Sequence, residues 1–308
     1  MSQIVALTGA SGFIGGVLAT RLREKGFRVR ALLRSHTHQQ CLEDIGVEVI
    51  KGNLDDGQAI NRMLQGCQTF IHCAGAIRGR NKQDFFPANI SSISHFIKTC
   101  RTIRPHPKII LISSLAAREP SLSHYAWSKR EGELTLSREA PDLPWVIFRP
   151  PAVYGPNDQS LRPLFKLMKL GIGVQLGSDN SRFSLIHVED FVRAVIDWVK
   201  TEGPTGYIYE IDDGFPGGHS WAEVFQSGER PIRLRLRLPP TALYVAATLN
   251  EKVSRLLGYL PLLTKGKVAE LLHSNWVCDT RETVKILNWQ PRISLKSGLR
   301  QLETSDNV

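Results

Sequence analysis

The sequence has few cysteines, and none stands in a spacing that binds a metal or forms a redox pair. Its five cysteines are scattered over 308 residues, with neither a C-x-x-C motif nor a cysteine and histidine ligand pattern. They are Cys41, Cys67, Cys73, Cys100 and Cys278. The sequence therefore predicts reduced, buried thiols in a cytosolic protein, and it predicts no bound metal.

Long apolar runs and targeting signals are also missing from the sequence. The apolar run near the C-terminus, 242–247, is far shorter than the roughly 20 residues that span a bilayer. The first basic residue is Arg21, and glycines interrupt the apolar start, so no secretory signal is expected. Basic residues are spread along the chain, and no nucleic-acid recognition motif is present. We expect a cytoplasmic protein that does not bind nucleic acid.

The charge of the chain is strongly positive. Lysine and arginine number 39 against 29 aspartates and glutamates, which gives a net charge of +10. Such a charge attracts anions, among them a phosphorylated cofactor, a nucleotide-linked substrate or an anionic membrane surface, although it also serves plain solubility. With 42% hydrophobic residues, the chain is able to bury a large core in one domain or two lobes.

Short apolar runs alternate with longer amphipathic stretches through the first half of the chain. This alternation is typical of β-α-β units and a parallel sheet. The expected strands are Ile4–Thr8, Arg28–Leu33, Val47–Ile50, Thr69–Ala74, Lys108–Ser113 and Trp145–Arg149. Helices are expected near 13–25, 56–65, 84–103 and 123–139. The predicted fold is α/β, a Rossmann-type doubly wound parallel sheet, in which ligands bind beyond the carboxyl ends of the strands.

The composition changes after Arg149 to turns rich in proline and glycine. We expect a dinucleotide-binding domain over 1–157, to which 183–201 return as a strand and helix of the main sheet. A smaller, interleaved substrate-binding lobe would comprise 158–182 and 202–308. In that lobe, 232–238 alternates apolar and basic residues, which predicts a strand, and a helix should follow Pro240.

A glycine-rich turn, T-G-A-S-G-F-I-G, runs from Thr8 to Gly15 between the first strand and the first helix. Gly9 permits a backbone conformation that a side chain penalises, Gly12 lets the main chain approach a pyrophosphate, and Gly15 lets the helix lie close to the strand. The N–H groups of the first helical turn then face the phosphates. The turn thus predicts a dinucleotide site made by Gly9, Ser11, Gly12, Phe13, Ile14 and Gly15.

Arg34 stands at the end of the second strand, where an NAD enzyme usually has an acidic residue. An arginine pairs with a 2′-phosphate and stacks on adenine, so we favour NADP(H) and keep NAD(H) as the alternative. Arg30 lies on the same face of the strand and would assist. The alternative for Arg34 is a solvated residue without a role in cofactor preference.

Other predicted cofactor contacts follow the later strands of the sheet. Asn53 and Leu54 would bracket the adenine, and the stretch Cys73, Ala74 and Gly75 would let the middle of the cofactor pass close to the backbone. The set is completed by Pro150 and Val153 after the sixth strand, and by Tyr125 and Lys129.

Tyr125 and Lys129 are four residues apart at the start of a helix and so share one helical face. A tyrosine has a pKa of about 10. Lowering it by about 3 units needs about 4 kcal/mol, which one cation about 4 Å away supplies at an effective dielectric of about 20. Lys129, helped by the positive charge of an oxidised nicotinamide, is therefore predicted to make Tyr125 a usable acid or base. Ser113 or Ser114, at the end of the fifth strand, would hold the substrate oxygen.

At these residues the chain resembles the extended short-chain dehydrogenase/reductases, also called the NAD-dependent epimerase/dehydratase family. The matching motifs are T-G-A-S-G-F-I-G, I-S-S, Y-A-W-S-K, R-P-P-A-V-Y-G-P-N-D and I-H-V-E-D-F. The resemblance covers nearly the whole chain. It implies a catalytic set of Ser114, Tyr125 and Lys129, with Asn89 as the family's helix asparagine that positions the lysine. Between the two serines, Ser114 is our choice.

The form of the sixth-strand motif resembles the 3β-hydroxysteroid dehydrogenase and dihydroflavonol reductase branches. Pro150 and Pro151 stand where sugar-nucleotide enzymes of the family carry an asparagine. The resemblance therefore implies a ketone and secondary alcohol oxidoreductase acting on an apolar small molecule. The alternatives are a nucleotide-sugar epimerase or dehydratase and a non-catalytic NADP(H)-binding module. Basic residues beside apolar helix faces over 233–267 further suggest a weak anionic-membrane contact, or else faces that close the pocket or a homodimer interface.

Overall fold

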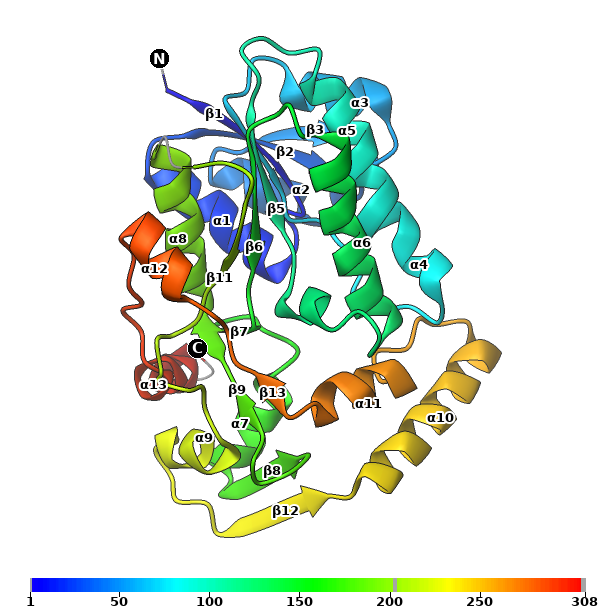
Figure 1. Ribbon diagram of the computed structural model, residues 1–308, viewed down its shortest axis with the longest axis vertical. Helices are drawn as coiled ribbons and strands as arrows, with labels where there is room; N and C mark the ends of the chain where they lie inside the picture. Colours follow the sequence, from blue (N-terminus) through cyan, green and yellow to red (C-terminus); the bar gives the residue numbers. More distant parts are fainter. Residues whose placement is uncertain (1, 202–203, 306–308) are drawn as a thin grey trace.

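A parallel sheet of seven strands forms the centre of the computed structural model, which describes residues 2–201 and 204–305 (Figure 1). The strand order is β11-β6-β5-β4-β1-β2-β3. The bounds are β1 Ile4–Thr8, β2 Arg28–Leu33, β3 Glu48–Lys51, β4 Thr69–His72, β5 Lys108–Ile112, β6 Trp145–Arg149 and β11 Tyr207–Glu210. The winding reverses between β1 and β4, where a crevice opens beyond the carboxyl ends of the strands. The predicted doubly wound Rossmann-type sheet is confirmed.

Helices cover both faces of this sheet, so its strands are buried on both sides. Alternate side chains of β1 enter opposite cores, with Leu7 in one and Ala6 in the other. On the first face lie α1 Phe13–Glu24, α2 Gln39–Asp44 and α8 Val188–Lys200. On the second lie α3 Gly57–Leu64, α5 Ser92–Cys100 and α6 His124–Glu139. The expected helix over 84–103 is instead divided into α4 Lys82–Phe86, a π-helical turn Pro87–Ser91 and α5.

The smaller lobe lies below the carboxyl edge of the sheet in Figure 1. Its strands form three two-stranded parallel pairs in the described part of the chain. These are β7 Ala152–Tyr154 with β10 Leu185–His187, β8 Ile172–Leu176 with β12 Leu234–Leu238, and β9 Arg182–Phe183 with β13 Asn275–Trp276. Its helices are α7 Arg162–Lys169, α9 Trp221–Ser227, α10 Pro240–Leu257, α11 Lys265–Leu272, α12 Arg281–Leu287 and α13 Leu295–Ser305. No helix among the described residues has the length and apolar character needed to cross a membrane.

Two segments take places that differ from the prediction. The strand within 183–201 does not rejoin the main sheet, because β10 pairs with β7 while only α8 returns to pack on α1. Pro150 and Pro151 separate β6 from β7, because proline has no N–H group to donate to a neighbouring strand. Conversely, β11 lies in the range assigned to the lobe, yet it pairs with β6 and extends the main sheet. The structure thus corrects the places of β10 and β11. The domain boundaries otherwise stay a prediction.

Candidate active site

The glycine-rich turn joins β1 to α1 in a conformation that side chains would block. Gly9 has a φ of +77°, and a Cβ there would lie 2.6 Å from the backbone nitrogen of Ala74. A Cβ on Gly15 would lie 2.0 Å from the carbonyl oxygen of Gly9. Helix α1 begins at Phe13 with no acidic residue in its first turn and no side-chain hydrogen bond at its N-cap, Gly12. This cradle fits a cofactor pyrophosphate, which the N–H groups of that turn would bind.

A buried hydrogen-bonded pair fixes the loop after β4 against this turn. The Oγ1 of Thr8 lies 2.8 Å from Nδ1 of His72 and accepts a hydrogen bond of 3.2 Å from the backbone nitrogen of Ala74. Burial lowers the pKa of His72 to about 3, and the Lys129 ammonium acts in the same direction. His72 is therefore a neutral, structural residue that holds Cys73, Ala74 and Gly75 at the crevice.

The predicted adenosine-binding residues lie at the carboxyl edge of β2 and β3. Arg34 and Asn53 are exposed there, and Leu54 is half-buried. Arg30 does not assist Arg34, because its guanidinium donates to the carbonyl oxygens of Arg62, Met63 and Gln65 at the end of α3. The prediction for Arg30 was therefore wrong, since the carbonyl oxygens at the C-terminus of α3 hold its guanidinium.

The three predicted catalytic residues meet where β5 ends. Ser114 opens the 3₁₀ turn Leu115–Arg118, while Tyr125 and Lys129 lie one turn apart at the start of α6, whose N-cap is Ser123. The Lys129 Nζ donates a hydrogen bond of 3.0 Å to the carbonyl oxygen of Ile112. Burial raises the pKa of Tyr125 to about 12, the hydrogen bond to Ser114 acts against this, and the Glu270 carboxylate adds to it.

The pKa of Tyr125 thus moves in the direction opposite to the prediction from Lys129. The cost of burying a phenolate is the largest cause, and burial lowers the pKa of Lys129 as well. At neutral pH, Tyr125 is consequently a protonated phenol. This form donates a proton, as the reduction of a ketone requires.

Ser113 and Ser114 have different surroundings. The Ser113 hydroxyl is buried and donates a hydrogen bond of 2.6 Å to Oε1 of Glu133. Both serines line the main cavity, but the Ser114 oxygen accepts a hydrogen bond of 3.2 Å from the backbone nitrogen of Ala116 and is hydrogen-bonded to Tyr125. This geometry favours Ser114 as the residue that meets the substrate.

Asn89 lies in the π-helical turn, a geometry often found at functional sites. Its side chain exchanges two hydrogen bonds with the backbone of Ala76, at 2.7 and 3.0 Å, and donates one of 2.8 Å to Ser128. A Cβ on Gly75 would lie 3.0 Å from the Asn89 oxygen and 3.3 Å from the Lys129 nitrogen. Asn89 thus packs beside Lys129 and ties its helix to the loop after β4.

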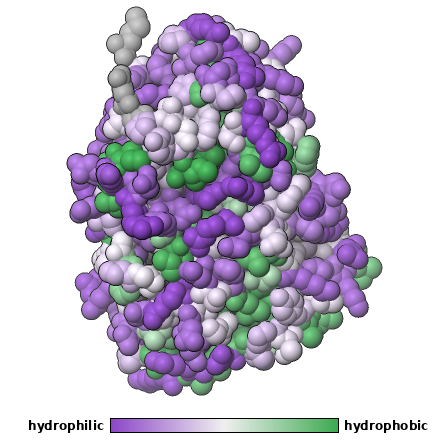
Figure 2. Space-filling model, viewed as in Figure 1, coloured by the Kyte–Doolittle hydropathy of each residue, from purple (hydrophilic) through white to green (hydrophobic). Residues whose placement is uncertain are grey.

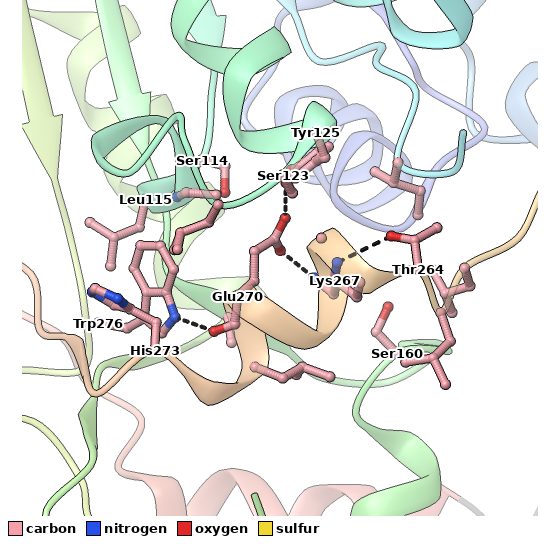
Figure 3. A pocket seen from close by; sticks show the side chains of 18 of the residues that line it. Ser114, Leu115, Ser123, Tyr125, Ser160, Thr264, Lys267, Glu270, His273 and Trp276 are labelled. Carbon is pink, nitrogen blue, oxygen red and sulfur yellow. Dashed lines mark hydrogen bonds and ion pairs between the residues drawn. The ribbon is translucent and has the colours of Figure 1, made fainter. Parts of the chain in front are cut away.

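A cavity of about 1330 Å³ runs from this site into the smaller lobe (Figure 3). Phe13, Ile14, Pro150 and Val153, which are predicted to contact the cofactor, line this cavity. The wall toward the lobe is largely apolar and includes Leu122, Leu161, Leu164, Phe165, Leu185, Trp221, Val224, Leu263 and Trp276. The cavity therefore suits a large apolar molecule.

Helix α11 brings three charged residues into this cavity that the sequence did not assign, Lys265, Lys267 and Glu270. In Figure 3 the Glu270 carboxylate lies between Ser123, which donates to it, and Lys267, whose Nζ is 2.8 Å away. A Cβ on Gly266 would lie 2.8 Å from the Cβ of Ser123, so this glycine allows the close approach of α11. Gly266 is the sequence feature that indicates this close packing of α11. The residue it packs against, Ser123, is distant along the chain.

The thiol of Cys73, beside the crevice, has a pKa that burial raises to about 12, so it is protonated and unreactive. Within residues 2–201 and 204–305, no group of three or more histidine, cysteine, aspartate or glutamate side chains is placed to hold a metal.

Known proteins resemble this chain in sequence and in fold. A model of the NAD dependent epimerase/dehydratase family matches residues 5–212. The ceramide reductase of Caulobacter vibrioides is 36% identical over 276 residues, which cover 89% of this chain and 85% of that protein. The decarboxylating sterol-4-alpha-carboxylate 3-dehydrogenase of Dictyostelium discoideum is 25% identical over 97% of this chain and 99% of its own.

A solved structure extends the likeness to the fold. The UDP-glucuronic acid 4-epimerase of Bacillus cereus, in complex with UDP-glucuronic acid and NAD, has a TM-score of 0.74 at 19% identity over 99% of both chains. At this identity the match shows the fold alone. The resemblance predicted from the motifs, including the hydroxysteroid dehydrogenase branch, is confirmed by the family model and the relatives. The chain is an NAD(P)-dependent oxidoreductase that belongs to the NAD dependent epimerase/dehydratase family.

Proposed function

We propose that this enzyme uses NADP(H) to interconvert a ketone and a secondary alcohol on a lipid-like substrate. The observation that carries the proposal is a protonated Tyr125 phenol, next to Ser114, at the wall of a largely apolar cavity of about 1330 Å³. The similarity to a ceramide reductase supports a ketone on a molecule with long acyl chains.

Each catalytic side chain has a separate task in this reaction. Tyr125 donates its proton to the carbonyl oxygen, where negative charge develops, and Ser114 donates a hydrogen bond that holds the same oxygen. Lys129, fixed by the carbonyl of Ile112, stabilises the phenolate that remains on Tyr125. The cofactor, when bound, supplies the hydride.

The polar residues of α11 are proposed to bind the polar part of the substrate. Lys267 Nζ lies 5.9 Å from the centre of the Tyr125 ring and pairs with the buried Glu270 carboxylate. Hydroxyl and amide groups beside the ketone would find both a donor and an acceptor there. An otherwise apolar cavity thus orients its substrate by one end.

Cofactor oxidation with defined substrates tests the proposal. The absorbance of NADPH should fall when a long-chain 3-keto amide lipid in detergent is added, and should not fall with UDP-sugars. An epimerase would instead interconvert the UDP-sugars without net oxidation of NADPH. That result, or binding of NADPH with no turnover of any ketone, would contradict the proposal and favour the epimerase or the non-catalytic module.

Arg34→Glu is expected to reverse the cofactor preference. The exposed guanidinium at the end of β2 is proposed to pair with the 2′-phosphate, and a carboxylate there would repel that phosphate and accept from a ribose hydroxyl. The ratio of kcat/KM for NADPH to that for NADH should fall at least tenfold. Arg138→Glu makes the same charge change in the last turn of α6 and should leave the ratio unchanged. An unchanged ratio in Arg34→Glu would show that Arg34 does not set the cofactor preference. Another residue would then set it, or the enzyme would use NAD(H).

The remaining assignments of the sequence belong to the same proposal. They are a cytoplasmic location, a homodimer, no nucleic-acid partner, and a weak contact with an anionic membrane. The cavity and the similarity to reductases of apolar substrates are what support a small, apolar substrate as the principal partner.

A further inference from the structure

Helix α10 carries a continuous apolar surface that faces solvent. Its members lie three, four or one residue apart and share one helical face. We call this surface the α10 stripe; it consists of Ala242, Val245, Ala246, Leu249, Val253, Leu256 and Leu257. Leu256 is 85% exposed and Leu249 is 57% exposed. Figure 2 shows hydrophobic side chains at the surface along the lower right and lower edge of the molecule, where α10 and β12 lie.

The α10 stripe is not the face by which α10 packs on the protein. Leu243 and Ala247 are buried on the other side of the helix, where they pack with Val268 of α11. The residues that α10 contributes to the cavity wall are Glu251 and Arg255, which also lie away from the stripe. The stripe therefore neither completes the core nor closes the cavity.

The chain after α10 leads from this stripe directly to the cavity. Helix α10 ends at Gly258, which has a φ of +76°, and the following loop exposes Leu260 and Leu262. Leu262 also lines the cavity, as does Ile77, which is exposed in the loop after β4. Arg80 joins the two loops, because its guanidinium donates to the carbonyl oxygen of Tyr259 at 2.7 Å. The apolar surface and the cavity thus meet at Leu262.

Basic residues surround this meeting point. Arg255 and Lys265 are exposed and line the cavity, and Lys82 lies there too, 4.3 Å above the Trp127 ring. Lys252 is exposed beside the α10 stripe, and Arg235 of β12 is exposed as well, whereas Arg237 of the same strand pairs with Asp179 at 3.3 Å. Glu251 is the acidic residue on this part of α10, and its carboxylate accepts a hydrogen bond of 2.8 Å from the backbone nitrogen of Lys265. The fixed charge around the stripe is therefore positive.

We propose that the α10 stripe and these cations bind an anionic membrane surface, and that the lipid substrate enters the cavity from the bilayer beside Leu262. An apolar helical face flanked by lysine and arginine is the arrangement that interfacial helices use. A second copy of the chain is a poorer occupant, because a two-fold contact would set the same cations against each other. The membrane part of the inference stands on the surface itself, whereas the entry route rests on the proposed function.

The test compares two double variants with matched charge changes. Leu249→Glu with Leu256→Glu places carboxylates in the α10 stripe, outside the cavity lining. Leu170→Glu with Val284→Glu is the control, at residues that are 71% and 37% exposed, the first directly after α7 and the second on α12. We expect the wild type and the control to co-sediment with vesicles of phosphatidylglycerol and phosphatidylcholine at low salt. Binding of the stripe variant should be at least tenfold weaker, and pure phosphatidylcholine should bind the wild type at least tenfold less.

Turnover separates the entry route from the proposed chemistry. A short, water-soluble ketone that all three proteins reduce at equal rates shows that the stripe variant is folded and active. A long-chain ketone embedded in the anionic vesicles should then be reduced at least tenfold more slowly by the stripe variant. Equal vesicle binding by all three proteins, or no binding by the wild type, would overturn the inference. A stripe variant that changes only from dimer to monomer in light scattering would assign the stripe to a second copy. No reduction of the soluble ketone by the wild type contradicts the proposed function instead, because sedimentation is measured without substrate.

Discussion

Tyr125→Phe is expected to lower kcat for ketone reduction by about 10²- to 10⁴-fold, the range that a positioned proton donor contributes. The change removes the one hydroxyl that meets both the cavity and Ser114, and it keeps the buried ring. The affinity for NADPH, measured by quenching of protein fluorescence, should stay within a few-fold of the wild type. Single-turnover absorbance at the nicotinamide band is the measurement, because it separates the chemical step from product release.

Tyr207→Phe, on the exposed edge strand β11, is the matched control and should leave kcat unchanged. The pH profile supplies a second readout. Because the pKa of Tyr125 is raised to about 12, its proton-donating form persists as the pH rises from 7 to 9. Titration of Tyr125 should therefore cause no loss of the wild-type rate of reduction in that interval. Any fall in the rate between pH 7 and 9 should also be present in Tyr125→Phe. Full activity in Tyr125→Phe would remove the phenol from the reaction and leave the fold as a cofactor-binding module.

The parts of this site that the sequence predicts are those written in short, continuous stretches. The glycine-rich turn is one such stretch, because the backbone geometry at Gly9 and Gly15 depends on neighbours that are close in the chain or in the adjacent strand. The placement of Tyr125 and Lys129 on one face follows from helical periodicity alone. The positions of β1 to β6 along the chain follow from the local alternation of apolar and polar runs.

The parts that the sequence does not predict depend on contacts between distant segments. Glu270 reaches the active site because α11 packs on the start of α6, 147 residues away along the chain from Ser123. Arg30 was assigned to the cofactor from its strand face, whereas the carbonyls at the end of α3 decide its position. The direction of the pKa of Tyr125 depends on its burial and on the Glu270 carboxylate of the smaller lobe, which no spacing motif records. Local patterns thus identify the reacting groups, and packing decides their protonation and their surroundings.

Arg149→Met is expected to lower the free energy of unfolding by about 3–5 kcal/mol, which is typical for removal of one partner of a buried ion pair. Arg149 donates to Glu133 through two hydrogen bonds of 2.8 and 2.6 Å, and their side chains are only 10% and 2% exposed. Methionine fills a similar volume but leaves the buried Glu133 carboxylate with only the more exposed Arg130, 3.4 Å away, as its counter-charge. Urea unfolding followed by circular dichroism measures the loss, provided that the slope with urea is unchanged.

The control for this loss is Arg101→Met, because Arg101 pairs at 2.7 Å with Asp142 on the surface, where an ion pair contributes about 0–1 kcal/mol. Adding Glu133→Gln to Arg149→Met should recover part of the stability, since it removes the uncompensated charge rather than the packing. The effect should reach catalysis as well, because Glu133 holds Ser113 at 2.6 Å, next to Ser114, and lies one turn beyond Lys129 on α6. A loss in Arg149→Met no larger than in Arg101→Met would show that water or proton uptake satisfies Glu133, and that the end of β5 is positioned by packing alone.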